Sequence, residues 1–331
     1  MIDARIVPVT APPRQRLSTR GRLAFGRLAQ GRVSKYRADK AMDDQSIEPL
    51  TRYAAERQHR AAALDRPCKI CGADSRVIDI LDFNKICGPP TAYFENTKIG
   101  VGVEYRRCLR CGFIFTQFFD EFTRDLWVTF VYNSDYYSSI DPEYKSIRPR
   151  QKSYQLRCLL RSPNAGWVGL DYGGGGGLLS QLMRESGYVF DSFDPFGVNT
   201  TQEVNRGKYN LCTLFEVAEH AVDPIGVLGE IVSISSPARL GVLVGTEIHD
   251  RQHLQPGHLA DWWYAAPRNG HVSLFSKASL ARLAASHSLS YSGLSRGIHF
   301  FYRGYSHLEA RRMLLMGKLR ARVGRILRGK R

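Results

Sequence analysis

Residues 167–182 read WVGLDYGGGGGLLSQL: an apolar run that ends in an aspartate, five consecutive glycines, and the start of an amphipathic stretch. A strand, a glycine loop and a helix in this order are typical of nucleotide-type cofactor sites, because glycine lets the backbone turn sharply and approach a ligand closely. The helix that follows offers free amide groups at its N-terminus. A flexible glycine linker is the alternative, but linkers are rarely framed by a hydrophobic strand and an amphipathic helix.

The spacing of these residues indicates which kind of cofactor binds. The pattern is Asp171-x-Gly173-x-Gly175-x-Gly177, whereas a dinucleotide site usually reads G-x-G-x-x-G with its acidic residue about 20 positions later. An acid placed before the glycines suits a cofactor that carries an amino acid and a sulfonium better than one that carries a pyrophosphate. Asp194 follows the next apolar run, where the end of a second strand would hold ribose hydroxyls.

This region resembles a known family. The segment 169–195, with Phe215-Glu216-Val217-Ala218-Glu219-His220 downstream, is similar to the class I S-adenosylmethionine-dependent methyltransferases. Their first motif is an acid followed by alternating glycines, and their fourth strand is often followed by E-V-x-E-H. The resemblance implies an α/β fold with a Rossmann-like, mostly parallel sheet, S-adenosylmethionine as cofactor and methyl transfer as activity. It implies this cofactor-binding set: Asp171, Gly173, Gly175, Gly177, Asp194 and Glu216.

The region between Asp194 and Tyr209 departs from the family pattern. The family usually places a helix, a third strand and an adenine-contacting acid there, but only 14 residues separate these two positions. A helix and a strand barely fit in that length. The sequence therefore assigns no residue to the adenine pocket.

Candidate catalytic residues follow from the chemistry of methyl transfer, an in-line displacement in which an acceptor hydroxyl or amine also needs a base. Glu219 and His220 follow the fourth strand at its carboxyl end, where ligands of open α/β sheets bind. His220 is the first candidate for the base or for an acceptor contact, and capping of the next helix is the alternative. His271, which follows an irregular segment at about 246–270, completes the candidate catalytic set.

Two closely matching cysteine pairs, Cys68-Lys69-Ile70-Cys71-Gly72 and Cys108-Leu109-Arg110-Cys111-Gly112, predict a metal site. Two residues between the cysteines let a tight turn aim both sulfurs inward, and four thiolates suit one tetrahedral zinc ion. Four sulfurs leave no open coordination position, which favours a structural role. Disulfide pairing is the alternative, and Cys87 is a fifth cysteine nearby.

A four-cysteine module ahead of such a domain resembles the nucleotide-sugar C-methyltransferases, as does the connector with Tyr132-Asn133-Ser134-Asp135-Tyr136-Tyr137 and Asp141-Pro142-Glu143-Tyr144. Their catalytic His/Tyr pattern is not evident, so the resemblance implies a sugar, glycan or related small-molecule acceptor without implying C-methylation. The expected organisation is a basic, disordered tail (1–45), a zinc-binding module (46–120), an aromatic connector (121–150), the methyltransferase domain (151–302) and a basic amphipathic C-terminal helix (303–331).

The net charge of +16 is concentrated in the two tails, because residues 1–40 carry +8 and residues 303–331 carry +9. The body is close to neutral, which argues against RNA as the acceptor, although zinc modules and basic tails also suit an RNA methyltransferase. A non-catalytic binding protein with a degenerate methyltransferase fold is the other alternative.

The C-terminal helix resembles one that lies on an anionic membrane surface. Seven cysteines and no long apolar run predict a cytoplasmic protein, peripheral at the inner membrane surface through this helix.

Overall fold

The computed structural model describes residues 44–61, 66–88, 98–195, 206–249, 255–293 and 295–328. Residues 38–331 form one compact unit, and residues 1–37 lie outside the described residues. The tail expected at 1–45 therefore falls almost wholly outside the description. Among the described helices, none combines the length and the apolar character that crossing a bilayer requires.

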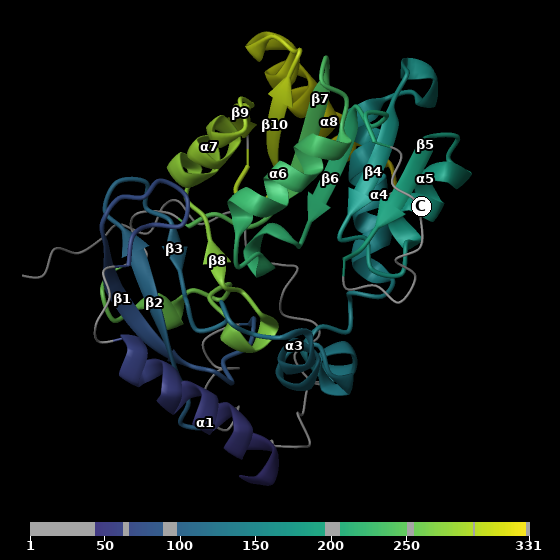
Figure 1. Ribbon diagram of the computed structural model, residues 1–331. Helices are drawn as coiled ribbons and strands as arrows, with labels where there is room; N and C mark the ends of the chain where they lie inside the picture. The colour runs from purple at the N-terminus through teal and green to yellow at the C-terminus, as the bar shows by residue number, and fades with distance from the viewer. Residues whose placement is uncertain are drawn as a thin grey trace, which may run out of the picture. The chain divides into compact units, whose positions relative to one another are not determined.

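A six-stranded sheet forms the core of the larger part, in the order β5-β4-β6-β7-β10-β9 (Figure 1). The pairs β5–β4, β4–β6 and β6–β7 are parallel, and β10 is antiparallel to both β7 and β9. The predicted α/β fold with a mostly parallel sheet is confirmed. The strands are β4 (Val168–Tyr172), β5 (Val189–Phe193), β6 (Leu211–Phe215), β7 (Leu240–Gly245), β9 (Ser290–Gly293) and β10 (His299–Arg303).

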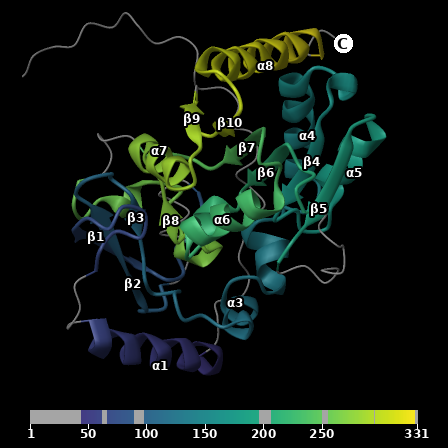
Figure 2. The ribbon, with the colours of Figure 1, turned by 45° about the horizontal axis from the view of Figure 1, so that its top comes forward.

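Helices cover both faces of this sheet, so the strands read as buried apolar runs with little alternation. On one face, buried residues of α6 (Pro224–Ile234) and α7 (Lys277–Ser286) pack against the sheet. On the other face lie α4 (Ile147–Leu160), α5 (Leu178–Glu185) and α8 (His307–Arg328). Figure 2 shows α8 lying beside α4, and there Arg320 donates to the carbonyl of Cys158 at 2.8 Å.

A second, four-stranded sheet carries the cysteine pairs, in the order β1-β2-β3-β8. Its first three strands are β1 (Ser75–Asp82), β2 (Gly102–Cys108) and β3 (Ile114–Phe115), all antiparallel. The fourth, β8 (Ser273–Leu274), comes from the far end of the chain and pairs with β3. The segment after His271 therefore completes the sheet of the N-terminal module and ties the two sheets together.

The remaining elements are short, apart from the first helix. The first helix is α1 (Asp44–Ala61), which precedes the first cysteine pair. The aromatic connector contains α3 (Arg124–Phe130) and the π-helical turn η1 (Tyr136–Ile140). No strand lies between β5 and β6 among the described residues, which exclude 196–205. The described residues also contain four single 3₁₀ turns: η2 (Pro163–Ala165), η3 (Ala218–His220), η5 (Leu259–Asp261) and η6 (Pro267–Asn269).

Candidate active site and metal centre

The glycine loop joins the end of β4 to the start of α5, as the sequence predicts. Gly173, Gly175 and Gly177 have φ angles of 77°, 53° and 74°, a region that other residues rarely occupy. A Cβ atom at Gly174 would overlap Ser192 and Asp171, and one at Gly175 would overlap the hydroxyl of Tyr144. The alternating glycines are therefore required by both backbone conformation and space, which a flexible linker would not need.

The two predicted carboxylates lie on either side of this loop. Asp171, at the end of β4, is 5 % exposed and accepts a hydrogen bond of 2.6 Å from Thr213 on β6. Burial raises its pKa to about 7, and the nearby charge of Asp194 acts in the same direction. Asp194 accepts a bond of 2.7 Å from the amide of Gly175. The acid predicted to hold ribose hydroxyls thus also fixes the conformation of the glycine loop.

Two basic residues that the sequence reasoning missed come from one face of α4. Lys152 donates to Glu216 at 2.9 Å, and Arg148 lies 3.6 Å from the other carboxylate oxygen of Glu216. Arg148 also pairs with the buried Asp141 at 2.8 Å. Their spacing of four residues on a helix was visible in the sequence, but nothing there indicated that the helix would face the glycine loop.

A cavity of about 640 Å³ opens between these elements. Glu216, which has a φ of 57°, directs its carboxylate into this space from the end of β6. Tyr144 covers the loop from the connector, and its ring contacts that of Tyr137 at 5.6 Å between centroids. The predicted cofactor residues all line this one cavity: Asp171, Gly173, Gly175, Gly177, Asp194 and Glu216.

The three predicted catalytic residues also come together, beside this cavity. Glu219 and His220 belong to the turn η3 after β6, and His271 follows the left-handed Gly270. One ligand-type atom from each of the three lies within 4.8 Å of the other two. Their proximity depends on the long segment after β7 folding back, which no spacing in the sequence specifies.

Burial determines the charge of this cluster. It lowers the pKa of His220 to about 4 and that of His271 well below its usual value, so both imidazoles are neutral at pH 7. Burial raises the pKa of Glu219 to about 8, although Tyr264 donates a hydrogen bond of 2.5 Å to its carboxylate. Tyr132 lies 3.2 Å from Nδ1 of His220 and links the cluster to the aromatic connector.

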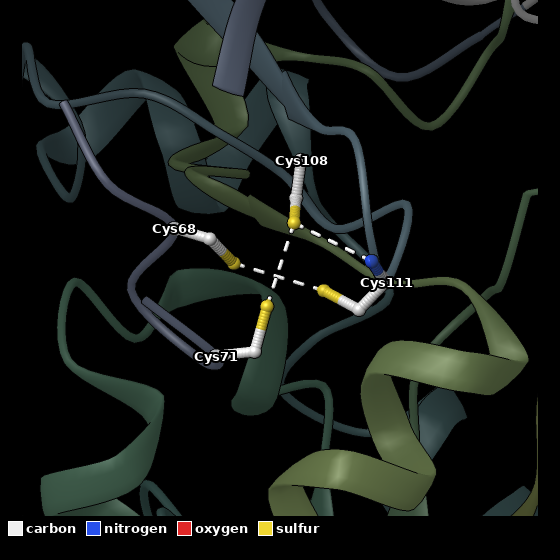
Figure 3. A group of neighbouring side chains, drawn as sticks. All are labelled: Cys68, Cys71, Cys108 and Cys111. Carbon is white, nitrogen blue, oxygen red and sulfur yellow. Dashed lines mark hydrogen bonds between the residues drawn. The ribbon is translucent and has the colours of Figure 1, made fainter. Parts of the chain in front are cut away.

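The four predicted metal ligands converge at the edge of the small sheet (Figure 3). Sγ of Cys68 lies 3.7 Å from that of Cys111, and Sγ of Cys71 lies 3.5 Å from that of Cys108. Tetrahedral zinc–thiolate bonds of about 2.3 Å place sulfurs roughly 3.8 Å apart, so the donor set fits one zinc ion. These separations are far too long for disulfide bonds.

Both cysteine turns have the same backbone geometry. The amide of Gly72 donates to the carbonyl of Cys68 at 2.9 Å, and the amide of Gly112 donates to that of Cys108 at 3.1 Å. Both glycines have left-handed φ angles, of 65° and 69°. Amides of Ile70, Arg110 and Cys111 point at sulfur at 3.4 Å, the arrangement that stabilises thiolates in such turns.

Residues 144–290 match the family model of a methyltransferase domain. This range runs from Tyr144 above the glycine loop to the start of β9 and includes every residue of the cofactor cavity from Lys145 to Glu216. It also includes the Glu219–His220–His271 cluster. The cysteine module and α8 lie outside the match. No curated protein matches the chain.

Solved structures resemble about half of the chain. A putative O-methyltransferase from Nostoc punctiforme is 13% identical, with 49% of this chain and 59% of that one covered and a TM-score of 0.38. TnmH is 16% identical, with 49% and 57% covered and a TM-score of 0.35. The magnesium protoporphyrin IX methyltransferase of Synechocystis, with bound SAH, is 14% identical, with 47% and 83% covered and a TM-score of 0.32. The chain thus spans less than three fifths of the first two of these proteins.

Proposed function

We propose that the protein binds S-adenosylmethionine at the glycine loop and transfers the methyl group to a sugar, a glycan or a related small-molecule acceptor. The match of residues 144–290 to a methyltransferase domain supports the reaction class. The observation that carries the proposal is the loop itself: Asp194 holds the amide of Gly175, and the buried Asp171 lies beneath the glycines. The glycine loop can contact a ligand at close range because its residues have no side chains.

The bound cofactor would supply an activated methyl group on a sulfonium, so the chain mainly has to align the reactants. Alignment of this kind is worth about 7–11 kcal/mol of the activation barrier. Asp171 suits the cationic amino-acid end of the cofactor, and Asp194 suits hydroxyl groups. Arg148 and Lys152 fix Glu216 at the mouth of the cavity, where it separates the cofactor side from the Glu219–His220–His271 cluster.

The cluster at the carboxyl end of β6 is the proposed acceptor side. Its two neutral imidazoles accept hydrogen bonds from a hydroxyl or an amine at pH 7, as an acceptor contact requires. The cofactor cavity holds three basic and three acidic side chains and is thus balanced in charge. This balance favours a small acceptor over RNA, whose phosphates would need a basic surface around the reaction site.

Calorimetry with two glycine variants tests the cofactor assignment. Gly175→Ala places a methyl group against Tyr144 at a left-handed φ, and we expect it to weaken S-adenosylmethionine binding at least about tenfold. Gly176→Ala is the matched control, since a Cβ atom at Gly176 meets nothing within 4 Å and its φ is ordinary. Equal affinities of both variants, or no binding by the unmodified protein, would exclude this site.

We also propose that the four cysteines hold one structural zinc ion. The sulfur separations, the two identical turns and the amides aimed at sulfur all support this. Four protein ligands leave no position for a substrate, so the ion would stabilise the small sheet and take no part in methyl transfer.

A membrane contact through α8 is a further part of the proposal. The helix leaves Leu308, Leu315 and Leu319 exposed, and basic residues such as Arg311 and Arg322 flank them. An apolar row between cations is complementary to an anionic lipid surface.

A further inference from the structure

We propose that Glu219, His220 and His271 form a second metal site, which binds a divalent first-row ion such as Zn²⁺. The site lies at the carboxyl end of β6, apart from the four cysteines, and its residues come from two segments about 50 positions apart. The site shares its residues with the acceptor side proposed above, and an ion there would replace the direct contact between the imidazoles and the acceptor. The tests below measure ion binding alone, so their failure would leave the proposed cofactor binding and methyl transfer untouched.

The two histidines are held as metal-binding histidines usually are. His271 donates from Nδ1 to the carbonyl of Tyr264 at 2.7 Å, so its other ring nitrogen, Nε2, is the one left for an ion. Nδ1 of His220 lies 3.2 Å from the hydroxyl of Tyr132, and the ring also hydrogen-bonds to the backbone of Gly270, so both contacts hold the imidazole in place. A ligating histidine characteristically binds a backbone carbonyl or a similar group with its other nitrogen, because this fixes the tautomer and the ring orientation.

The strongest support for an ion comes from the carboxylate of Glu219. Its side chain is fully buried, and Oε1 accepts from Tyr264, but Oε2 has no hydrogen-bond partner among the described residues. No ion pair within the described part of the chain involves this carboxylate. Buried carboxylate oxygens are normally paired, bonded or bound to a metal, so the orphaned atom marks the position of a ligand.

The geometry suits a three-ligand site. The three ligand atoms lie within 4.8 Å of one another, and bonds of about 2.0–2.2 Å would require them to close to roughly 3–4 Å. The rings of His220 and His271 are 5.0 Å apart and nearly perpendicular, so both can point at one ion. Two histidines and one glutamate leave a coordination position open, as in catalytic zinc sites, and this position would take water or an acceptor hydroxyl.

Cys87 borders this site without completing it. Its sulfur lies 3.7 Å from Nδ1 of His271, the nitrogen already engaged by the Tyr264 carbonyl, and 4.0 Å from Nε2. Cys87 is not among the three residues whose ligand atoms all lie within 4.8 Å of one another. We therefore assign it no bond to the ion.

The metal content of the full chain tests the proposal. After removal of all metal and reconstitution with Zn²⁺, mass spectrometry under native conditions should find two ions per chain, and His271→Ala should retain one. His258→Ala is the matched control, because His258 is exposed and its side chain hydrogen-bonds to Asp261, away from the cluster. Cys87→Ser should still bind two ions. One ion in both the unmodified chain and His271→Ala would overturn the second site.

Cobalt substitution gives an independent readout that needs no variant. Co²⁺ bound by four thiolates gives intense sulfur-to-metal charge-transfer bands, whereas Co²⁺ bound by two histidines and a carboxylate gives weak visible bands alone. Titration should show two phases, the second of them free of charge-transfer intensity. A titration that ends after the thiolate phase overturns the proposal, and Gly175→Ala should leave both phases unchanged even if it abolishes cofactor binding.

Discussion

At the scale of a single residue, Asp171 is the buried acid of the cofactor cavity. It is buried beneath the glycine loop, whereas Asp194 and Glu216 remain partly exposed. The pKa of Asp171 in the folded protein is about 7, which is above the ordinary value of 3.8. The folded state therefore loses stability as the pH rises from about 4 through 7, because the buried carboxyl group has to ionise. A cationic ligand would recover this cost by pairing with the carboxylate, as expected of a group placed for binding and not for stability.

Cofactor affinity should therefore depend on pH through Asp171. The ionised fraction rises about tenfold between pH 6 and pH 8 for a pKa near 7, and we expect S-adenosylmethionine to bind up to about tenfold more tightly at pH 8. Calorimetry across this range measures the change. Asp171→Asn should bind weakly with a flatter pH dependence, because the amide keeps the shape and loses the titration. An unaltered pH profile in this variant would assign the titration to another group.

The residues of the site differ in how far sequence could specify them. Asp171 and the alternating glycines could be predicted, because their conformation and spacing depend on contacts within one short segment. Arg148 and Lys152 could not, since their role depends on which face of α4 meets the loop. His271 was placed beside Glu219 by a segment that folds back over the sheet, which local periodicity does not encode.

At the scale of the element, α8 shows what periodicity predicts and what it leaves open. The basic amphipathic pattern predicted a helix over 303–331, and α8 spans His307–Arg328. The apolar residues, however, do not form one face. Ala310 and Leu314 are buried on the side that meets α4, whereas Leu308, Leu315 and Leu319 are exposed. The sequence could not show which side of the helix packs on the protein and which side is exposed.

The exposed row of α8 should bind anionic vesicles. We expect the full chain to sediment with phosphatidylcholine vesicles that contain phosphatidylglycerol, and not with phosphatidylcholine alone, with a strong salt dependence. Replacing Leu315 and Leu319 by Glu should abolish sedimentation, because it removes apolar contact and adds repulsion. Val128→Glu, on an equally exposed residue of α3, is the control for added negative charge. Binding that survives the double substitution would place the contact elsewhere.

At the scale of the whole compact unit, the two sheets are joined by contacts that the order of the strands along the chain does not reveal. The pairing of β3 with β8 joins the cysteine module to the segment that carries His271. Val272 donates to the carbonyl of Glu219 at 2.8 Å, and Phe113 beside the second cysteine pair packs on Phe275 at 5.1 Å between centroids. The resemblance to the class I methyltransferases implied the large sheet, but a two-residue strand contributed from far along the chain has no sequence pattern of its own.

This shared structure predicts that loss of the cysteine-bound zinc destabilises both sheets together. Cys71→Ser should lower the melting temperature by at least about 10 °C, and scanning calorimetry should still show one transition for residues 38–331, because buried residues near the cysteines belong to the core of the large sheet. Since the same variant loosens β8, it should also weaken metal binding at His271, whereas His271→Ala should leave the cysteine site loaded. Two separate transitions, with S-adenosylmethionine shifting the upper one alone, would instead show that the cysteine module folds independently and that the acceptor side does not depend on it.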